Sequence, residues 1–192
     1  EVAFLLNIAQ NVSLIGMVAY LLTRLQVFQR TLSSPEGNWL DKLLLGSIFG
    51  IISAAGNWIG IPVHGAIANT RIVGAIVGGL VGGPLVGFIA GLIGAFARYF
   101  MGGFTVWPAV LSNIIVGIFS GLIQEKYGSH GINVQRAFVV SLASEAILKI
   151  MILLMAKPFE AAWELEKTIG IPTIIGNSFA VVFFIYMIRN VL

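Results

Sequence analysis

The sequence predicts an all-α integral membrane protein, a polytopic helical bundle with almost no soluble portion. Hydrophobic residues make up 58% of its 192 residues, and charged residues only 10%. The mean hydropathy of +0.97 is far above the range of soluble domains. The formal net charge is +3, from basic residues that are spread along the chain and often border apolar runs. This spread favours residues that set membrane topology over a nucleic-acid-binding patch.

Five apolar runs approach the roughly 20 residues that an α-helix needs to cross a bilayer. They predict membrane helices over residues 2–23, 43–63, 106–124, 137–156 and 171–188. The polar connections are too short to fold on their own, and they cover residues 24–42, 125–136 and 157–170. We therefore expect a single transmembrane domain over residues 1–192.

A sixth apolar stretch, residues 72–100, is too long for one ordinary span and is interrupted by Gly82-Gly83-Pro84. Glycine and proline break helices. The stretch therefore predicts two short helices, over residues 72–82 and 85–100, joined by a turn. The predicted element is a broken helical hairpin.

The distribution of basic residues predicts an orientation, because lysine and arginine accumulate on the cytoplasmic side of membrane proteins. If the connection 24–42 is cytoplasmic, alternation also places Lys126, Arg136 and Arg189 inside. The N-terminus is then outside and the C-terminus inside, provided that residues 72–100 enter and leave on the same side. If that stretch instead crosses once, the N-terminus is inside.

Arg71 and Arg98 flank the broken stretch, at a depth where an arginine costs about 2.5–3.5 kcal/mol. On one continuous helix they would lie about 40 Å apart at the usual rise per residue, too far for one small ligand. A reversal at the Gly-Gly-Pro turn gives arms of about 16 and 21 Å and returns both arginines to the same end, which creates a cationic pocket. The alternative is that each side chain extends to the lipid headgroups and binds nothing in particular.

A helix that begins near Trp107 and Pro108 adds to this predicted pocket. Proline is favoured in a first helical turn, and the free N–H groups and dipole there favour an anion. Ser112 lies one turn further along. Two guanidinium groups, a helix N-terminus and a hydroxyl suit a small carboxylate, because arginine can bind a carboxylate with two parallel hydrogen bonds.

Other small and polar residues favour structural roles. Glycines recur at small-xxx-small spacing between residues 74 and 121, which lets helices pack closely in lipid. Glu145 and Lys149 stand four residues apart and predict an ion pair within one helix. Asn113 and Asn177 predict hydrogen bonds between helices.

The sequence contains no motif for metal binding or catalysis. The two histidines, His64 and His130, have no second ligand residue at metal spacing, and the chain has no cysteine. No Ser-His-Asp order, carboxylate pair or nucleophile motif is present. We therefore expect no enzyme within this chain and no cofactor.

Several motifs together resemble a known family. They are Ala68-Asn69-Thr70-Arg71, the core Gly82-Gly83-Pro84-Leu85-Val86-Gly87, Arg98-Tyr99, Gly102-Gly103-Phe104-Thr105, and Ile171-Pro172 with Asn177-Ser178. From about Leu40 to the C-terminus, the chain is similar to the LytS/YehU-type sensor module, the five-transmembrane receptor region of a class of bacterial histidine kinases. The resemblance implies a receptor in the bacterial cytoplasmic membrane that detects an extracellular signal and passes it through its last helix to a cytoplasmic output.

The resemblance also implies a ligand and a set of site residues. In the pyruvate-sensing branch, two arginines and a small polar cluster hold the ligand, and the matching positions are Arg71, Arg98, Ala109 and Ser112, with Asn69 beside them. Ala109 departs from that branch, which looks to have a cysteine there, and Lys149 stands where the family tends to have an uncharged polar residue. A homodimer and a response regulator are the implied partners, the latter through a kinase domain that is absent from residues 1–192.

The leading hypothesis is a sensor that binds a small carboxylate, pyruvate or a related 2-oxo acid, in a pocket that opens to the outside. The competing class is a small-solute transporter or the substrate-binding component of one, because transporters also use broken helices near an anion site. A purely structural membrane anchor would leave the paired arginines unexplained.

Overall fold

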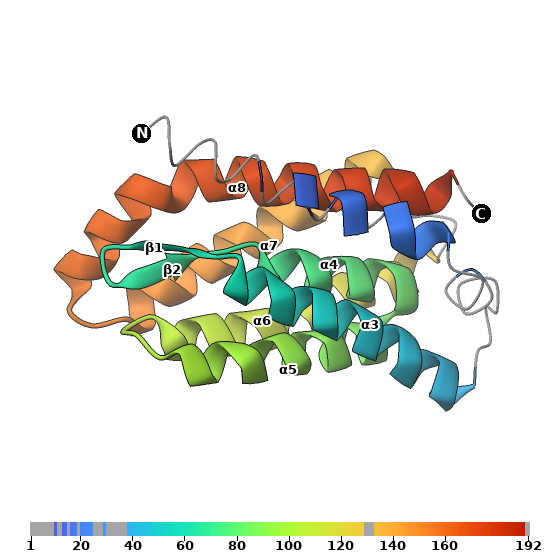
Figure 1. The fold of residues 1–192 in the computed structure, drawn as a ribbon, viewed down its shortest axis with the longest axis horizontal. Helices are drawn as coiled ribbons and strands as arrows, with labels where there is room; N and C mark the ends of the chain where they lie inside the picture. Colours follow the sequence, from blue (N-terminus) through green and yellow to red (C-terminus); the bar gives the residue numbers. More distant parts are fainter. Residues whose placement is uncertain are drawn as a thin grey trace.

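The computed structural model describes residues 38–128 and 133–190, together with residues 10, 13, 14, 16–18, 20–24 and 29 of the N-terminal segment. These residues form helices that run along one long axis (Figure 1), and the predicted all-α class is confirmed. The helix predicted over residues 2–23 is only partly described, and His130 lies outside the described residues.

From residue 38 onward, the described chain contains six helices. They are α3 (Trp39–Trp58), α4 (Arg71–Gly82), α5 (Pro84–Met101), α6 (Val106–Tyr127), α7 (Val134–Met155) and α8 (Phe159–Arg189). All of them except α4 are long and apolar enough to cross a membrane. The bounds of α4 to α7 differ from the predicted ones by at most three residues. A short antiparallel ribbon joins α3 to α4 and consists of β1 (Ile61–Val63) and β2 (Ala66–Ala68).

The predicted broken hairpin is formed by α4 and α5. Gly83 follows α4 with a φ of 85°, a conformation that favours glycine. Pro84 is the first residue of α5, where its missing N–H costs little. With 12 residues, α4 is about 18 Å long, little more than half of the roughly 30 Å hydrocarbon core. It does not cross a bilayer on its own, and the β1–β2 ribbon lies beyond its N-terminal end (Figure 1).

The helix predicted over residues 43–63 begins earlier, at Trp39, and ends earlier, at Trp58. It ends there because the sequence after Trp58 disfavours a helix. Pro62 has no N–H to donate to a preceding turn, and it restricts the residue before it. His64 and Gly65 both have positive φ, 48° and 75°, which is the pattern of the two-residue turn that matches the twist of paired strands. Residues 61–68 therefore form the ribbon.

The predicted start of the last helix at residue 171 is wrong, because α8 begins at Phe159. Pro158 is its N-cap residue and Glu160 lies in its first turn, where negative charge interacts favourably with the helix dipole. Glutamate, alanine, leucine and lysine have high helix propensity. The charged residues 157–170 therefore extend the apolar helix instead of forming a polar connection.

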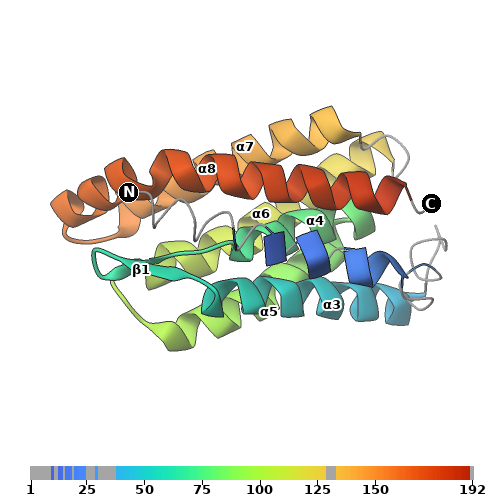
Figure 2. The ribbon, with the colours of Figure 1, turned by 45° about the horizontal axis from the view of Figure 1, so that its top comes forward.

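The helices pack in layers (Figure 2). α7 and α8 lie on one side, α3 and α5 lie on the other, and α4 and α6 lie between them. Every residue from Arg71 to Leu80 of α4 is buried. α5 and α6 approach backbone to backbone, because a Cβ on Gly87 would overlap the carbonyl group of Gly117, and one on Gly117 would overlap that of Gly87. The predicted close packing of glycines is therefore present.

Exposed aromatic side chains mark both ends of the bundle. Trp58, Tyr99 and Trp107 lie at the end that holds the β1–β2 ribbon, here named the ribbon end, and Trp39 and Tyr127 lie at the opposite end. Between Trp39 and Trp58, α3 is about 28 Å long, close to the thickness of a hydrocarbon core. Belts of this kind are typical of membrane–water interfaces, so helix length and aromatic positions fit one bilayer.

Candidate ligand-binding site

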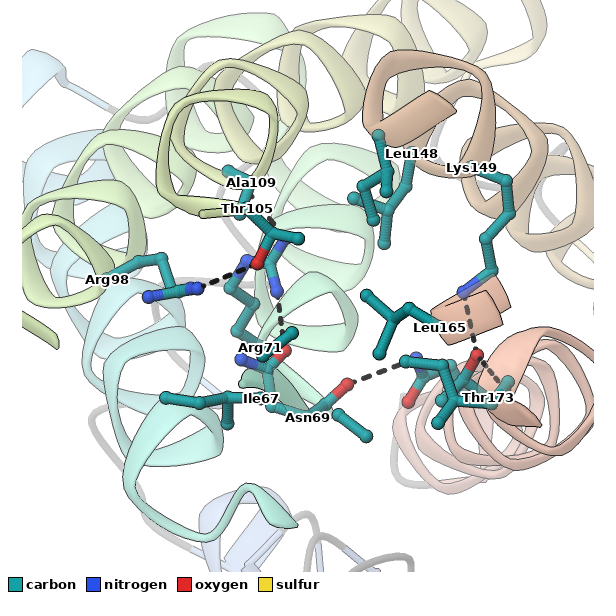
Figure 3. Close-up of a pocket in the computed structure, with 15 residues that line it drawn as sticks. Ile67, Asn69, Arg71, Arg98, Thr105, Ala109, Leu148, Lys149, Leu165 and Thr173 are labelled. Carbon is teal, nitrogen blue, oxygen red and sulfur yellow. Dashed lines mark hydrogen bonds between the residues drawn. The ribbon is translucent and has the colours of Figure 1, made fainter. Parts of the chain in front are cut away.

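A cavity lies between helices α4–α6 and the layer formed by α7 and α8, beside the β1–β2 ribbon (Figure 3). It has about 30 Å³ open to the centres of water molecules, which is room for about two waters. One wall is largely polar and includes Asn69, Arg71, Arg98, Thr105 and Ala109, and the ribbon adds the apolar residues Ala66, Ile67 and Ala68. The opposite wall comes from α7 and α8 and consists of Leu148, Lys149, Ile152, Leu165, Ile169, Thr173 and Asn177.

Arg71 is the first residue of α4 and is 4% exposed. Its Nη1 donates to Asn69 Oδ1 at 2.6 Å, and its Nη2 donates to the carbonyl oxygen of Ala109 at 3.3 Å. Its Nε is buried and has no hydrogen-bond partner among the described residues. Both of its acceptors are neutral groups, so the charge of this guanidinium is not balanced by its hydrogen bonds.

Arg98 lies in the last turn of α5 and is 1% exposed. Its Nη1 donates to the carbonyl oxygen of Gly102 at 2.6 Å, and its Nη2 donates to Thr105 Oγ1 at 3.1 Å (Figure 3 shows the second bond). Its Nε likewise has no hydrogen-bond partner in the part of the chain that the structure describes. Carbonyl groups at the C-terminus of a helix interact favourably with a cation, which explains the position of this side chain across the end of α5.

Within the described part of the chain, neither guanidinium forms an ion pair with a carboxylate. Arg71 and Arg98 are thus two buried cations that line one cavity and have neutral hydrogen-bond partners. A buried charge is costly unless it is paired. The polar wall is therefore electrostatically suited to an anion.

A hydrogen-bonded polar network fixes the start of α4 against α3 and α5. Asn69 Nδ2 donates to Asn57 Oδ1 at 3.1 Å, and Asn57 Nδ2 donates to the carbonyl oxygen of Gly94 at 3.1 Å. Ser53 Oγ donates to the carbonyl oxygen of Arg71 at 2.7 Å. Because these groups are buried and bonded, they hold the backbone of Arg71 in place.

Asn113 belongs to the same network and connects α6 to its neighbours. Its Nδ2 donates to Ser53 Oγ at 3.1 Å and to the carbonyl oxygen of Gly91 at 3.0 Å. These bonds confirm the predicted role of Asn113 between helices.

The opposite wall contains a buried charged cluster. Lys149 Nζ lies 3.5 Å from Glu145 Oε2 and 3.4 Å from Glu166 Oε2, and it donates to Thr173 Oγ1 at 2.8 Å. The predicted pair of Glu145 and Lys149 is confirmed. Glu166 was not predicted as a partner, because the charged segment that contains it was expected to be a loop.

Asn177 of α8 connects the two walls. Its Nδ2 donates to Glu145 Oε1 at 2.7 Å and to the main-chain carbonyl oxygen of Asn69 at 3.4 Å. The predicted interhelical role of Asn177 is confirmed. The polar wall and the charged cluster are therefore parts of one hydrogen-bonded network.

Four of the five predicted site residues line the cavity, namely Asn69, Arg71, Arg98 and Ala109. Ser112 does not line it. Its hydroxyl is fully buried and donates to the carbonyl oxygen of Ala109 at 3.1 Å. Thr105, the N-cap residue of α6, lies nearer to the arginines than Ser112 does, since it contacts Arg98 directly.

Residues of α8 in the opposite wall were missed. They recur every fourth position, which places them on one helix face, and they are Leu165, Ile169, Thr173 and Asn177. This spacing is visible in the sequence, but it becomes informative only if the helix is known to begin before residue 165.

The fold and this site define an α-helical membrane module that encloses a small cationic cavity between its layers. A family model described as "5TMR of 5TMR-LYT" matches residues 25–191. The chain therefore belongs to the 5TMR-LYT family, the five-transmembrane receptor region of LytS-type sensor histidine kinases, as its motifs predicted.

Relatives with known names agree with this assignment. The chain is 32% identical to sensor protein LytS of Bacillus subtilis, over 95% of this chain and 34% of that protein. It is 31% identical to sensor histidine kinase BtsS of Escherichia coli K12, over 96% of this chain and 34% of that protein. It is 28% identical to sensor histidine kinase YpdA of the same strain, over 97% of this chain and 33% of that protein. It thus spans about a third of the length of these relatives. No solved structure matches the chain.

Proposed function

We propose that this chain is the transmembrane sensor region of a bacterial two-component histidine kinase, and that it binds a small extracellular carboxylate, pyruvate or a related 2-oxo acid. One observation supports this most directly. Arg71 and Arg98 are both buried, and both line the same cavity. Neither has a carboxylate partner among the described residues. An anionic ligand would supply the missing charge.

The donors available at the polar wall suit a carboxylate. The Nε atoms of Arg71 and Arg98 lack partners, and the Nη atoms bond neutral acceptors. A carboxylate adds charge–charge attraction and a bidentate geometry that neutral acceptors do not offer to an arginine, so it replaces the neutral acceptors favourably. The Thr105 hydroxyl accepts from Arg98 and can donate its own proton to a keto oxygen.

Ligand binding in this cavity requires the walls to separate. A three-carbon acid needs more space than about two waters, which is the size of this cavity. The cavity is bounded by α4–α6 on one side and α7–α8 on the other. A ligand that fits only the separated arrangement shifts the population toward it. Because α8 continues to the C-terminal end of the described chain, its displacement would carry the signal inward.

The basic residues support an extracellular position for the ribbon end. Lys126, Arg136 and Arg189 all lie at the opposite end of the bundle, while Glu160 and Glu164 lie at the start of α8, at the ribbon end. With positive charge inside, the ribbon and the cavity face the outside of the cytoplasmic membrane, and the C-terminus is cytoplasmic. This is the orientation predicted for a hairpin that enters and leaves on the same side.

The relatives supply the proposed partners. Those described above are named as sensor proteins or sensor histidine kinases, and this chain covers only their receptor third. We infer a kinase domain as the output, a cytoplasmic response regulator as its partner, and a homodimer as the signalling unit.

The test is a titration of pyruvate, lactate, acetate and succinate into the purified, detergent-solubilised chain. Saturable binding of one acid by the native chain, lost in Arg71→Ala and in Arg98→Ala, is the expected result. Arg189→Ala is the matched control, because this arginine is exposed at the far end of the same bundle. Thermal unfolding of each variant separates loss of binding from loss of fold.

Two outcomes would contradict the proposal. If none of the acids binds a folded native chain, the site is not a carboxylate receptor. If vesicles that contain only this chain accumulate the acid against a control without protein, the chain is a transporter rather than a sensor.

A further inference from the structure

The two walls of the cavity differ in chemistry, and the difference bears on which acids fit. Building on the proposed function, we infer that the site selects acids that have one carboxylate and a short aliphatic end. The buried cluster of Glu145, Lys149 and Glu166 is the specificity determinant that rejects a second carboxylate.

The wall opposite the arginines is mainly aliphatic. Leu148 and Ile152 of α7 and Leu165 and Ile169 of α8 all line the cavity, and Figure 3 shows Leu148 and Leu165 on the side away from Arg98. When the arginines hold the carboxylate of a ligand, its other end faces these side chains. Apolar atoms gain free energy there by leaving water, whereas a second carboxylate loses its hydration without a partner.

Lys149 is the one cation among the residues of that wall, and it already interacts with other side chains. Three oxygen atoms surround its ammonium nitrogen. They are Thr173 Oγ1 at 2.8 Å, which accepts a hydrogen bond, and Glu166 Oε2 at 3.4 Å and Glu145 Oε2 at 3.5 Å, which are ion-pair contacts. The charge of Lys149 is therefore already balanced by two carboxylates.

The charge of the cluster also disfavours a second anion. Two carboxylates and one ammonium give a formal charge of −1, and the side chains are shielded from water, with exposed fractions of 0% for Glu145, 8% for Glu166 and 14% for Lys149. Electrostatic repulsion is weakly screened in such surroundings. A ligand with a carboxylate at each end would bring its second charge toward this cluster.

The inference is tested with two acids that differ only at the far end. The acids 2-oxovalerate and 2-oxoglutarate share the 2-oxo acid group and the number of carbons, but one ends in a methyl group and the other in a carboxylate. Titration into the detergent-solubilised native chain, with pyruvate alongside, is expected to give at least tenfold tighter binding of 2-oxovalerate.

Variants identify the cluster as the cause. Glu166→Gln removes one negative charge and keeps the shape, so we expect the tenfold preference to shrink to less than threefold. Glu145→Gln makes the same change of charge from α7 and replaces the first variant if that one fails to fold. Glu164→Gln is the matched control on the same helix, because Glu164 is 63% exposed and its ion-pair partner, Lys167, is exposed as well. It should keep the native preference.

Each outcome decides between the two hypotheses. Equal binding of the two five-carbon acids, tighter binding of 2-oxoglutarate, or binding of pyruvate alone overturns the selectivity inferred here while leaving the carboxylate site intact. A native preference that survives both glutamine variants overturns the role of the cluster. If no acid binds, pyruvate included, the proposed function itself fails.

Discussion

The side-chain amide of Asn177 donates a hydrogen bond to the main-chain carbonyl oxygen of Asn69, at 3.4 Å. The side chain of Asn69 in turn accepts a hydrogen bond from Arg71. α8 is thus connected to an arginine of the cavity through a single intervening residue. If a ligand moves Arg71, we expect Asn69 to move with it and the contact with Asn177 to pass the change to α8.

Replacement of Asn177 by alanine is expected to separate ligand binding from the response of α8. Asn177→Ala removes the bond to Asn69 and also the one to Glu145, but no bond of either arginine. We expect pyruvate affinity within about threefold of the native value, because each direct contact of the polar wall remains. The ligand-induced displacement of α8 should be lost.

The displacement can be measured as a distance between two spin labels. The chain has no cysteine, so the substitutions Lys126→Cys and Arg189→Cys introduce a unique labelled pair at the ends of α6 and α8. Ser178→Ala is the matched control, since the buried hydroxyl of Ser178 has no hydrogen-bond partner within residues 38–128 and 133–190 or the described N-terminal residues. A pyruvate-dependent distance change that persists in Asn177→Ala would show that the signal reaches α8 by another route.

Gly87→Ala is expected to destabilise the bundle. The added Cβ would overlap the carbonyl group of Gly117 across the α5–α6 contact, and overpacking of this kind costs about 1–3 kcal/mol. Leu92→Ala, at a half-exposed position of the same helix, should change stability less. The measurement is the thermal unfolding midpoint in detergent, and equal midpoints for the two variants would contradict the close approach of these helices.

The sequence is sufficient to predict the parts of this fold that depend on local chemistry. Hydropathy determines the class, and the Gly82-Gly83-Pro84 motif determines the reversal between α4 and α5. The reversal is what brings Arg71 and Arg98 to one cavity. The pair of Glu145 and Lys149 follows from spacing within one helix.

The second wall of the cavity is not predictable in the same way, because it depends on packing between distant segments. Glu166 contacts Lys149 across two helices, and no local spacing indicates such a contact. The start of α8 was also mispredicted because of its charged residues. Residues 157–170 are as polar as a loop, but their residue types have high helix propensity. Ser112 has the residue type of a ligand contact, yet its hydroxyl bonds its own helix.

Lys149→Met should destabilise the protein strongly. The change removes the only ion-pair partner that the structure describes for Glu145 and Glu166, and breaking a buried pair on one side costs about 3–5 kcal/mol. Adding Glu145→Gln and Glu166→Gln to the same chain should restore most of the lost stability, because no unpaired charge remains. Lys167→Met, at an exposed ion pair, should have little effect on unfolding in detergent.

A different result would change the interpretation of this cluster. If the single variant Lys149→Met unfolds at the native midpoint, the two carboxylates do not depend on the lysine for their stability. The cluster would then be neutral or hydrated, and its proposed repulsion of a second ligand carboxylate would lose its basis.

The orientation of the bundle decides whether the cavity can report on the outside of the cell. Glu164→Cys places a single thiol at the ribbon end, and Lys126→Cys places one at the opposite end, both at exposed positions. If the basic end is cytoplasmic, a membrane-impermeant maleimide should label the first variant in intact spheroplasts. It should label the second only after permeabilisation. The reverse pattern would place the cavity on the cytoplasmic side, and the ligand would then be an internal metabolite rather than an extracellular signal.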